Sequence, residues 1–182
     1  ANEFPEGRIE VVDSRNLSTG IGLIVMKAVD YIREGESDLK RLADRLREDT
    51  ARVETEFVID SLEYLHKGGR CSGTQRVFGT MLRIHPLIKV VDGGMILADK
   101  VRGKEEKVLE TLLNRALQFK DNMDPARIFV THSMGESKAR WLKEQLENRL
   151  EVREVLITDA GCVISSHCGP GTVGILFMKK NA

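Results

Sequence analysis

Apolar residues recur along the chain at two spacings, one typical of helices and one typical of strands. Spacings of three and four residues predict helices over 18–33, 37–52, 61–67, 75–82, 104–119 and 136–150. Short apolar runs predict strands over 8–14, 55–59, 87–91, 95–98, 127–131, 152–157, 163–166 and 173–178. Strands therefore alternate with helices through much of the chain, which predicts a mixed α/β fold.

Residues typical of turns and helix ends lie between several of these predicted elements. The segment 92–94, Asp-Gly-Gly, separates two apolar runs and predicts a β-hairpin. Ser18 is suited to capping the first helix, and Gly35 to ending it. The second helix has a charged face, expected in solvent, and an apolar stripe formed by Leu39, Leu42, Ala43 and Leu46.

A polar stretch over 49–54 separates a helical N-terminal part from a strand-rich remainder. It contains neither proline nor glycine, so any linker at this point is short. We therefore expect two units, a first one over 1–52 with a strand and helices, and an α/β domain over 53–182.

Composition narrows the class of protein. The 182 residues include 28 Lys or Arg and 28 Asp or Glu, so the formal net charge is zero. A protein that binds nucleic acid mainly through charge normally has a basic excess, so we expect no nucleic-acid partner. No apolar run is long enough to cross a bilayer. The three cysteines show no CxxC spacing, which favours a reducing, cytoplasmic location over a disulfide framework.

The stretch 163–177 carries the most specific chemistry. An apolar run ends at His167, a Gly169-Pro170-Gly171 turn follows, and a second apolar run begins. We expect this turn to hold His167 at the mouth of two buried strands, where an imidazole beside backbone N–H groups suits a carboxylate or phosphate. The alternative is a tight turn whose histidine only hydrogen-bonds its neighbours.

Two basic segments are further candidates. Arg70 follows Gly68-Gly69, and an arginine held by a turn can form two hydrogen bonds to a carboxylate or phosphate. The alternative is a glycine that ends a helix beside a solvated arginine. Lys100 and Arg102 follow the predicted hairpin and either guide an anion, dock a partner or belong to a solvated strand end.

The order of several short motifs resembles that of the DegV family of bacterial fatty-acid-binding proteins. The resemblance covers nearly the whole chain, although no single motif is decisive. The matching segments are Val12-Asp13-Ser14 with Gly20 and Gly22, Asp60 to Leu65 with Lys67 to Arg70, Pro86 to Ile88 with Asp92-Gly93, Lys100 to Arg102, and His167 with Gly169 to Gly171.

The resemblance implies a two-domain α/β protein that holds a long-chain fatty acid in an apolar tunnel. FakB-like members present the carboxylate to a fatty acid kinase, which forms the acyl-phosphate, so the resemblance implies a carrier without catalytic residues, metal or cofactor. It places His167, Arg70, Gly69, Gly169 and Gly171 at the ligand. Further members of the implied site, which support the carboxylate or dock the kinase, are Lys100 and Arg102.

The chain departs from the family pattern in two respects. It lacks the opening Thr-Asp-Ser strand and the later Ser-Gly-Thr-Tyr-Gln-Ser-Ala segment, so we expect it to be a C-terminal portion of such a protein. Residues 1–52 would then be the remnant of an N-terminal domain, whose missing part is either a separate chain or lost. His85 stands where the family commonly has a lysine before the proline.

Other functions remain open at this point. An enzyme acting on a small phosphorylated or carbonyl substrate would use the same glycine-rich anion site but would have a polar pocket. A protein-interaction module would carry its lipid as a structural component. Transient contact with a membrane is compatible with a lipid carrier.

Overall fold

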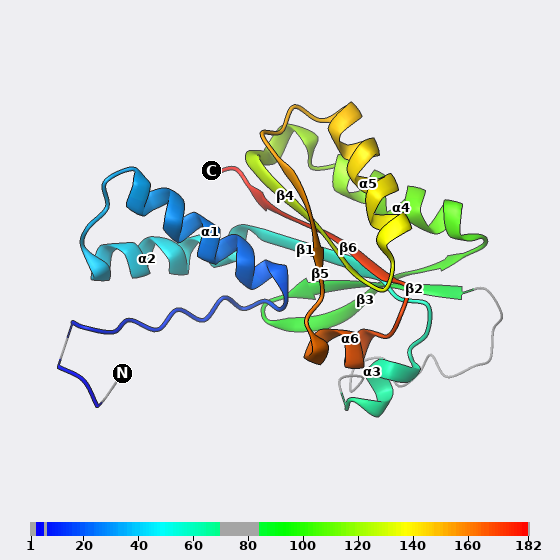
Figure 1. Cartoon of the computed structure of the whole chain (residues 1–182), viewed down its shortest axis with the longest axis horizontal. Helices are drawn as coiled ribbons and strands as arrows, with labels where there is room; N and C mark the ends of the chain where they lie inside the picture. The colour runs from blue at the N-terminus through cyan, green and yellow to red at the C-terminus, as the bar shows by residue number, and fades with distance from the viewer. Residues whose placement is uncertain (1–2, 6, 70–83, 182) are drawn as a thin grey trace.

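The computed structural model describes residues 3–5, 7–69 and 84–181. Its centre is a six-stranded sheet with the strand order β3-β2-β1-β6-β4-β5 (Figure 1). The mixed α/β fold predicted from the apolar pattern is confirmed. The strands are β1 (Val53–Val58), β2 (Ile84–Val91), β3 (Gly94–Arg102), β4 (Met123–Ser133), β5 (Val155–Asp159) and β6 (Thr172–Lys179).

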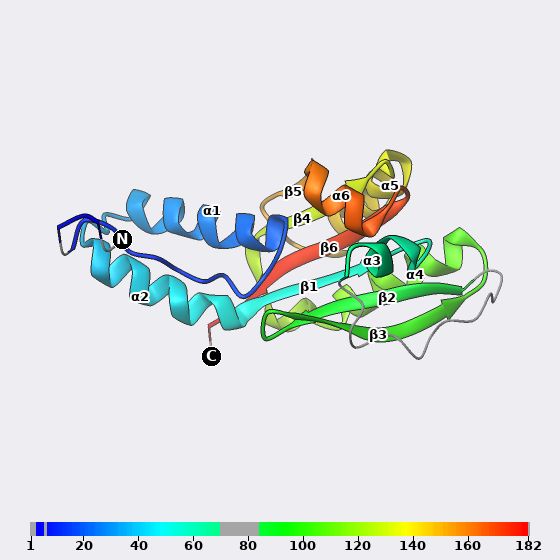
Figure 2. The ribbon, with the colours of Figure 1, turned by 90° about the horizontal axis from the view of Figure 1, so that it is seen from below.

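The last strand in the sequence lies in the middle of the sheet. Strand β6 pairs antiparallel with β1 on one side, where Thr55 faces Leu176, and with β4 on the other, where Phe129 faces Leu176. Figure 2 shows β6, in red, running beside β1, in cyan. Strand β5 pairs parallel with β4, while β2 and β3 form the predicted antiparallel hairpin around the turn at Asp92-Gly93.

Helices cover both faces of the sheet (Figure 1). The largest apolar cluster lies between α4, α5 and the sheet, and Leu112, Leu142 and Ile175 are at most 1% exposed within it. Burial of these apolar side chains away from water is the main contribution to the stability of the fold. The helices are α1 (Thr19–Arg33), α2 (Leu39–Asp49), α3 (Glu63–Lys67), α4 (Glu105–Leu117), α5 (Glu136–Arg149) and α6 (Cys162–Cys168).

The opposite face of the sheet is shared between α1 and the short helices α3 and α6. Leu23, Ile24 and Tyr31 of α1 pack on Leu176 of β6 and its neighbours. Gly35, with φ of 100°, follows the end of α1 as predicted, but the Ser18 side chain makes no capping hydrogen bond.

The sequence-based boundaries are correct to within a few residues for most of the elements that the structure describes. The helix expected over 75–82 lies outside the described residues. The strand expected over 163–166 is part of helix α6. In the second helix, Leu39 is 40% exposed, so the buried stripe of α2 is shorter than predicted.

The buried strand predicted over 8–14 is also wrong. The segment pairs with no strand among the described residues, and Ile9 and Val11 are 39% and 68% exposed. The Arg47 guanidinium donates hydrogen bonds to the Glu10 carboxylate and to the Val11 carbonyl. The second of these bonds engages a backbone carbonyl that strand pairing would otherwise use.

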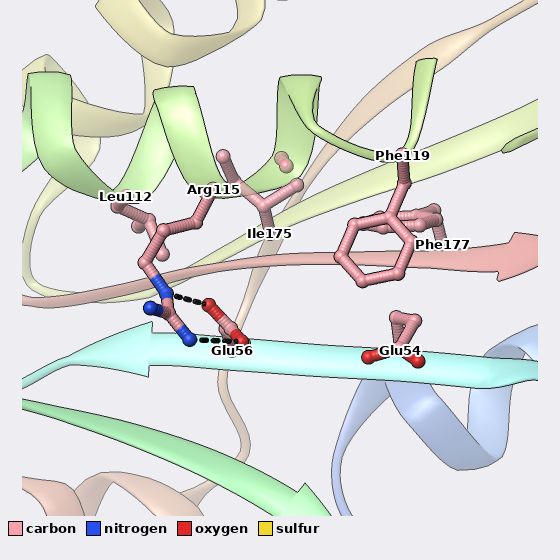
Figure 3. A pocket seen from close by; sticks show the side chains of 8 residues that line it. Glu54, Glu56, Leu112, Arg115, Phe119, Ile175 and Phe177 are labelled. Carbon is pink, nitrogen blue, oxygen red and sulfur yellow. Dashed lines mark hydrogen bonds and ion pairs between the residues drawn. The ribbon is translucent and has the colours of Figure 1, made fainter. Parts of the chain in front are cut away.

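Charged side chains form a cluster at the edge of the α4 core. The Arg115 guanidinium donates two hydrogen bonds, of 2.6 and 2.8 Å, to the Glu56 carboxylate (Figure 3). Glu54, two residues earlier on β1, accepts from Lys89 at 2.7 Å and from Lys179 at 2.9 Å. Burial alone raises the pKa of Glu54, but the hydrogen bonds and charges of the two lysines outweigh it, so the pKa is lowered.

Glu54→Gln should therefore reduce the loss of stability in acid. Because its pKa is lower in the folded state, Glu54 contributes stability above its unfolded pKa, and the contribution is lost as the pH falls through the folded pKa. The variant should be less stable by about 1 kcal/mol at ~pH 7 and should lose less stability between ~pH 5 and ~pH 3. Urea unfolding across this range measures both effects. Glu151→Gln, at an exposed position, is the control, and an identical acid profile for Glu54→Gln and wild type would contradict the assignment.

Candidate functional site

The segments singled out in the sequence converge at one edge of the sheet. Val58, at the end of β1, pairs with Val173, and Ser133, at the end of β4, pairs with Thr172 at the start of β6. The loops that follow β1, β4 and β5 and the loop that precedes β6 must therefore lie close together. Helices α3 and α6 lie side by side below this edge (Figures 1 and 2).

His167 lies on the last turn of α6, which corrects its predicted place between two strands. Ile164 and Cys168, four residues apart, pack toward the sheet, while Val163 is 68% exposed. This is the period of a helix, and the sequence Val-Ile-Ser-Ser was too short to distinguish it from a strand. Half-buried on the side of α6, His167 faces α3 rather than the sheet.

Gly68 makes room for the His167 ring. A Cβ atom on Gly68 would lie 2.5 Å from His167 Nδ1 and 3.0 Å from Cε1. Gly68 ends α3 with an ordinary helical φ of −77°, so the backbone does not require glycine there. The close approach of the imidazole is the reason that the position suits glycine.

Two further glycines interlock the same pair of segments. Gly169 has φ of 81°, and a Cβ atom there would overlap the Tyr64 ring of α3. Gly171 has φ of 78°, and its Cβ would overlap the Asp60 carboxylate. We call this contact, formed by Gly68, Gly169 and Gly171 with His167, Tyr64 and Asp60, the glycine interlock.

Asp60 is also the centre of a polar network. Its Oδ1 atom lies 3.3 Å from His85 Nδ1 and 3.5 Å from Lys138 Nζ. The Lys138 ammonium donates to the Gly171 carbonyl at 2.9 Å and lies 3.1 Å from Glu105 Oε2. The sequence reasoning missed Lys138, because a lysine in the first turn of a charged helix carries no distinguishing signal.

The structure places the remaining predicted site residues less centrally. Gly69 is exposed with φ of 70°, and among the described residues no atom beyond its chain neighbours lies within 4 Å of where its Cβ would be. Arg70 lies outside the described residues. Lys100 and Arg102 are exposed near the end of β3, at the same edge of the sheet, where Arg102 pairs with Ile84.

An apolar cavity of about 30 Å³ lies between α6, the start of α1 and the sheet. This is room for about one water molecule. Burial raises the pKa of the Cys168 thiol to about 11, so it remains a neutral part of the wall. The cavity is lined by Leu17, Ser18, Thr55, Phe57, Thr131, His132, Ala160, Ile164, Cys168, Thr172, Gly174 and Leu176.

Neither a metal centre nor a membrane span emerges from the described ranges 3–5, 7–69 and 84–181. Within them, no three His, Cys, Asp or Glu side chains gather as metal ligands would. Helices in the same ranges are too short or too polar to cross a bilayer.

Comparison with known proteins identifies relatives that match nearly the whole of this chain. A DegV domain-containing protein of Caldanaerobacter subterraneus subsp. tengcongensis is 32% identical over 178 residues, which cover 96% of this chain and 62% of that protein. A structure described as fatty acid binding of a DegV family protein from Thermus thermophilus is 32% identical, with a TM-score of 0.86, and the match covers 98% of this chain and 63% of that one.

The fold extends to a more distant structure. The Streptococcus pneumoniae Fatty Acid Kinase (Fak) B3 protein, loaded with linoleic acid, has a TM-score of 0.83 and 20% identity, covering 98% of this chain and 63% of that one. At this identity the likeness concerns the fold alone. The chain thus spans less than two thirds of the length of each of these relatives.

A family model described as an uncharacterised protein of the DegV family matches residues 1–180. The match includes α3, α6 and the glycine interlock between them. The chain belongs to the DegV family.

Proposed function

We propose that this chain is the larger part of a carrier that binds a long-chain fatty acid and presents its carboxylate to a fatty acid kinase in the cytoplasm. The observation that carries the proposal is the position of the His167 imidazole, which lies against Gly68 on one side of α6 while another side of α6 lines an apolar cavity. The fatty-acid-binding Thermus thermophilus relative has the same fold and supports the choice of ligand.

In this proposal the ligand has two separate sources of affinity. The carboxylate is held by His167 with Arg70, since a charge in an apolar site needs polar partners. The Gly69 and Gly169–Gly171 backbone lies beside it. Burial of the acyl chain contributes about 0.8 kcal/mol for each methylene group. Lys100 and Arg102, exposed near the same edge, support the carboxylate or receive the kinase.

The acyl chain requires more space than the apolar cavity now offers. A volume of about 30 Å³ holds little more than one methylene group. We therefore propose that the tail extends beyond this cavity, and hydrogen exchange in 160–171 should change on binding. We also propose that residues 1–52 belong to a first domain, completed in the relatives by the part of their length that this chain does not match.

His167→Ala should weaken fatty-acid binding by about tenfold or more, because a hydrogen bond to a charged group contributes about 1.5–3 kcal/mol. The dissociation constant for a fluorescent long-chain fatty acid, measured on the full product of the gene, checks this. His66→Ala, an exposed histidine on α3, is the matched control.

Several results would contradict the proposal. If His167→Ala bound the fatty acid as tightly as wild type, the assignment of His167 to the ligand site would be wrong. If native mass spectrometry found no fatty acid on the full gene product, even after incubation with one, a fatty acid would not be its ligand. Turnover of a small phosphorylated or carbonyl substrate by the protein alone would favour an enzyme instead.

A further inference from the structure

Lys138 occupies an unusual position for a surface lysine. Its side chain is only 11% exposed, although the nearby positions Ser137 and Arg140 on α5 are exposed. Removing an ammonium group from water is costly unless carboxylates and hydrogen-bond acceptors surround it. Here Asp60, Glu105 and the Gly171 carbonyl supply those partners.

These partners come from three segments that lie far apart in the sequence. Asp60 follows β1 and leads into α3, Glu105 begins α4, and Gly171 closes the turn between α6 and β6. The ammonium therefore joins the α3 side of the glycine interlock to the α6 side. The Gly171 N–H also donates to the Ser133 carbonyl at 2.8 Å, which fixes the turn to the end of β4.

We propose that Lys138 is a positioning residue for the candidate ligand site, holding Asp60 and the Gly169–Gly171 turn together so that His167 stays against Gly68. The expected effect of Lys138 on fatty-acid affinity rests on the proposed function. The geometric part of the inference, the fixed position of α6 and His167, does not depend on any ligand.

Helix α5 provides a closely matched control. Lys143 also donates to a carboxylate, Glu147 at 2.6 Å, and to a backbone carbonyl, that of Val155. Val155 begins β5, at the opposite end of that strand from the site. Lys143→Met therefore removes contacts of the same kind without touching the interlock.

The first test measures ligand affinity on the full gene product. Lys138→Met should weaken binding of the fluorescent fatty acid by about tenfold, Lys138→Arg should restore most of it, and Lys143→Met should bind as wild type. Wild-type affinity in Lys138→Met, or an equal loss in Lys143→Met, would overturn the inference.

The second test needs no ligand. In a background with Cys71→Ser and Cys162→Ser, the buried Cys168 thiol should react with a maleimide about tenfold faster in Lys138→Met than in wild type or Lys143→Met. The NMR signals of the His167 ring should shift in Lys138→Met alone. If wild type binds no fatty acid, the proposed function fails, while unchanged labelling and unchanged His167 signals in Lys138→Met would overturn the inference itself.

Discussion

Gly68→Ala should displace the His167 imidazole and weaken fatty-acid binding by as much as His167→Ala does. Alanine fits the backbone at this position, since φ is −77°, so the effect arises only from the added methyl group. That group would lie 2.5 Å from Nδ1, and either the ring or the whole of α3 must move. We expect a loss of about 1–3 kcal/mol in the free energy of unfolding, which urea denaturation measures.

The chain offers a matched control and a rescue for this variant. Gly161→Ala adds the same methyl group next to α6, at φ of −62°, where no atom of the described residues beyond the chain neighbours lies within 4 Å of the new Cβ. It should leave both stability and affinity near wild type. In a His167→Ala background, Gly68→Ala should cost little stability, because the ring that it clashes with is gone. Additive losses of stability in the double variant would show that the methyl group meets something else.

Arg115→Met should cause the largest loss of stability, about 3 kcal/mol, because it leaves the Glu56 carboxylate buried without its principal partner. The Glu56 side chain is 11% exposed, and Lys89 at 3.8 Å compensates only in part. The hydrogen bonds from Arg115 to Glu56 raise the pKa of the guanidinium, which is consistent with a tightly held pair. Urea unfolding at ~pH 7 measures the loss.

Two further variants distinguish the two possible causes of this loss of stability, an unpaired buried charge and the loss of packing around the arginine side chain. Glu56→Gln combined with Arg115→Met should recover much of the stability, since the uncompensated charge is removed. Arg140→Met breaks a pair with Glu136 whose side chains are 72% and 63% exposed, and it should cost less than about 0.5 kcal/mol. If the double variant were no more stable than Arg115→Met, the loss would come from packing around the arginine stem.

The sequence alone predicted those elements whose signals are local. The hairpin around Asp92-Gly93 depends on a turn that only a few residue types can form. The long helices α1 and α5 repeat their apolar period often enough to exclude a strand. The order of the short motifs was sufficient to identify the family, because it requires no knowledge of which segments are in contact.

The arrangement of the site depends on contacts between distant segments, which local patterns do not encode. His167 packs against Gly68, and Gly171 packs against Asp60. The two residues of each pair lie about a hundred residues apart in the sequence. Helix α6 was predicted as a strand because Val163 to Ser166 forms too short a run to show a period. No sequence pattern singles out Lys138, because its role depends on contacts with Asp60 and with the Gly169–Gly171 turn, which are distant in the sequence.

The segment over 8–14 illustrates a different limit. Its alternation of apolar and polar residues is that of a strand, but a strand exists only where a neighbouring strand supplies hydrogen bonds. No partner for it lies within the described residues.

The central position of β6 has a consequence for synthesis of the protein in the cell. A ribosome makes the chain from its N-terminus, so β1 and β4 emerge well before the strand that joins them. Until β6 has been synthesised, the sheet consists of the strands β1 to β3 and the β4–β5 pair, each with an unpaired edge at the place that β6 later fills. Chaperones that shield such edges should therefore associate with the nascent polypeptide before β6 emerges, and truncation before Thr172 should leave an aggregating product.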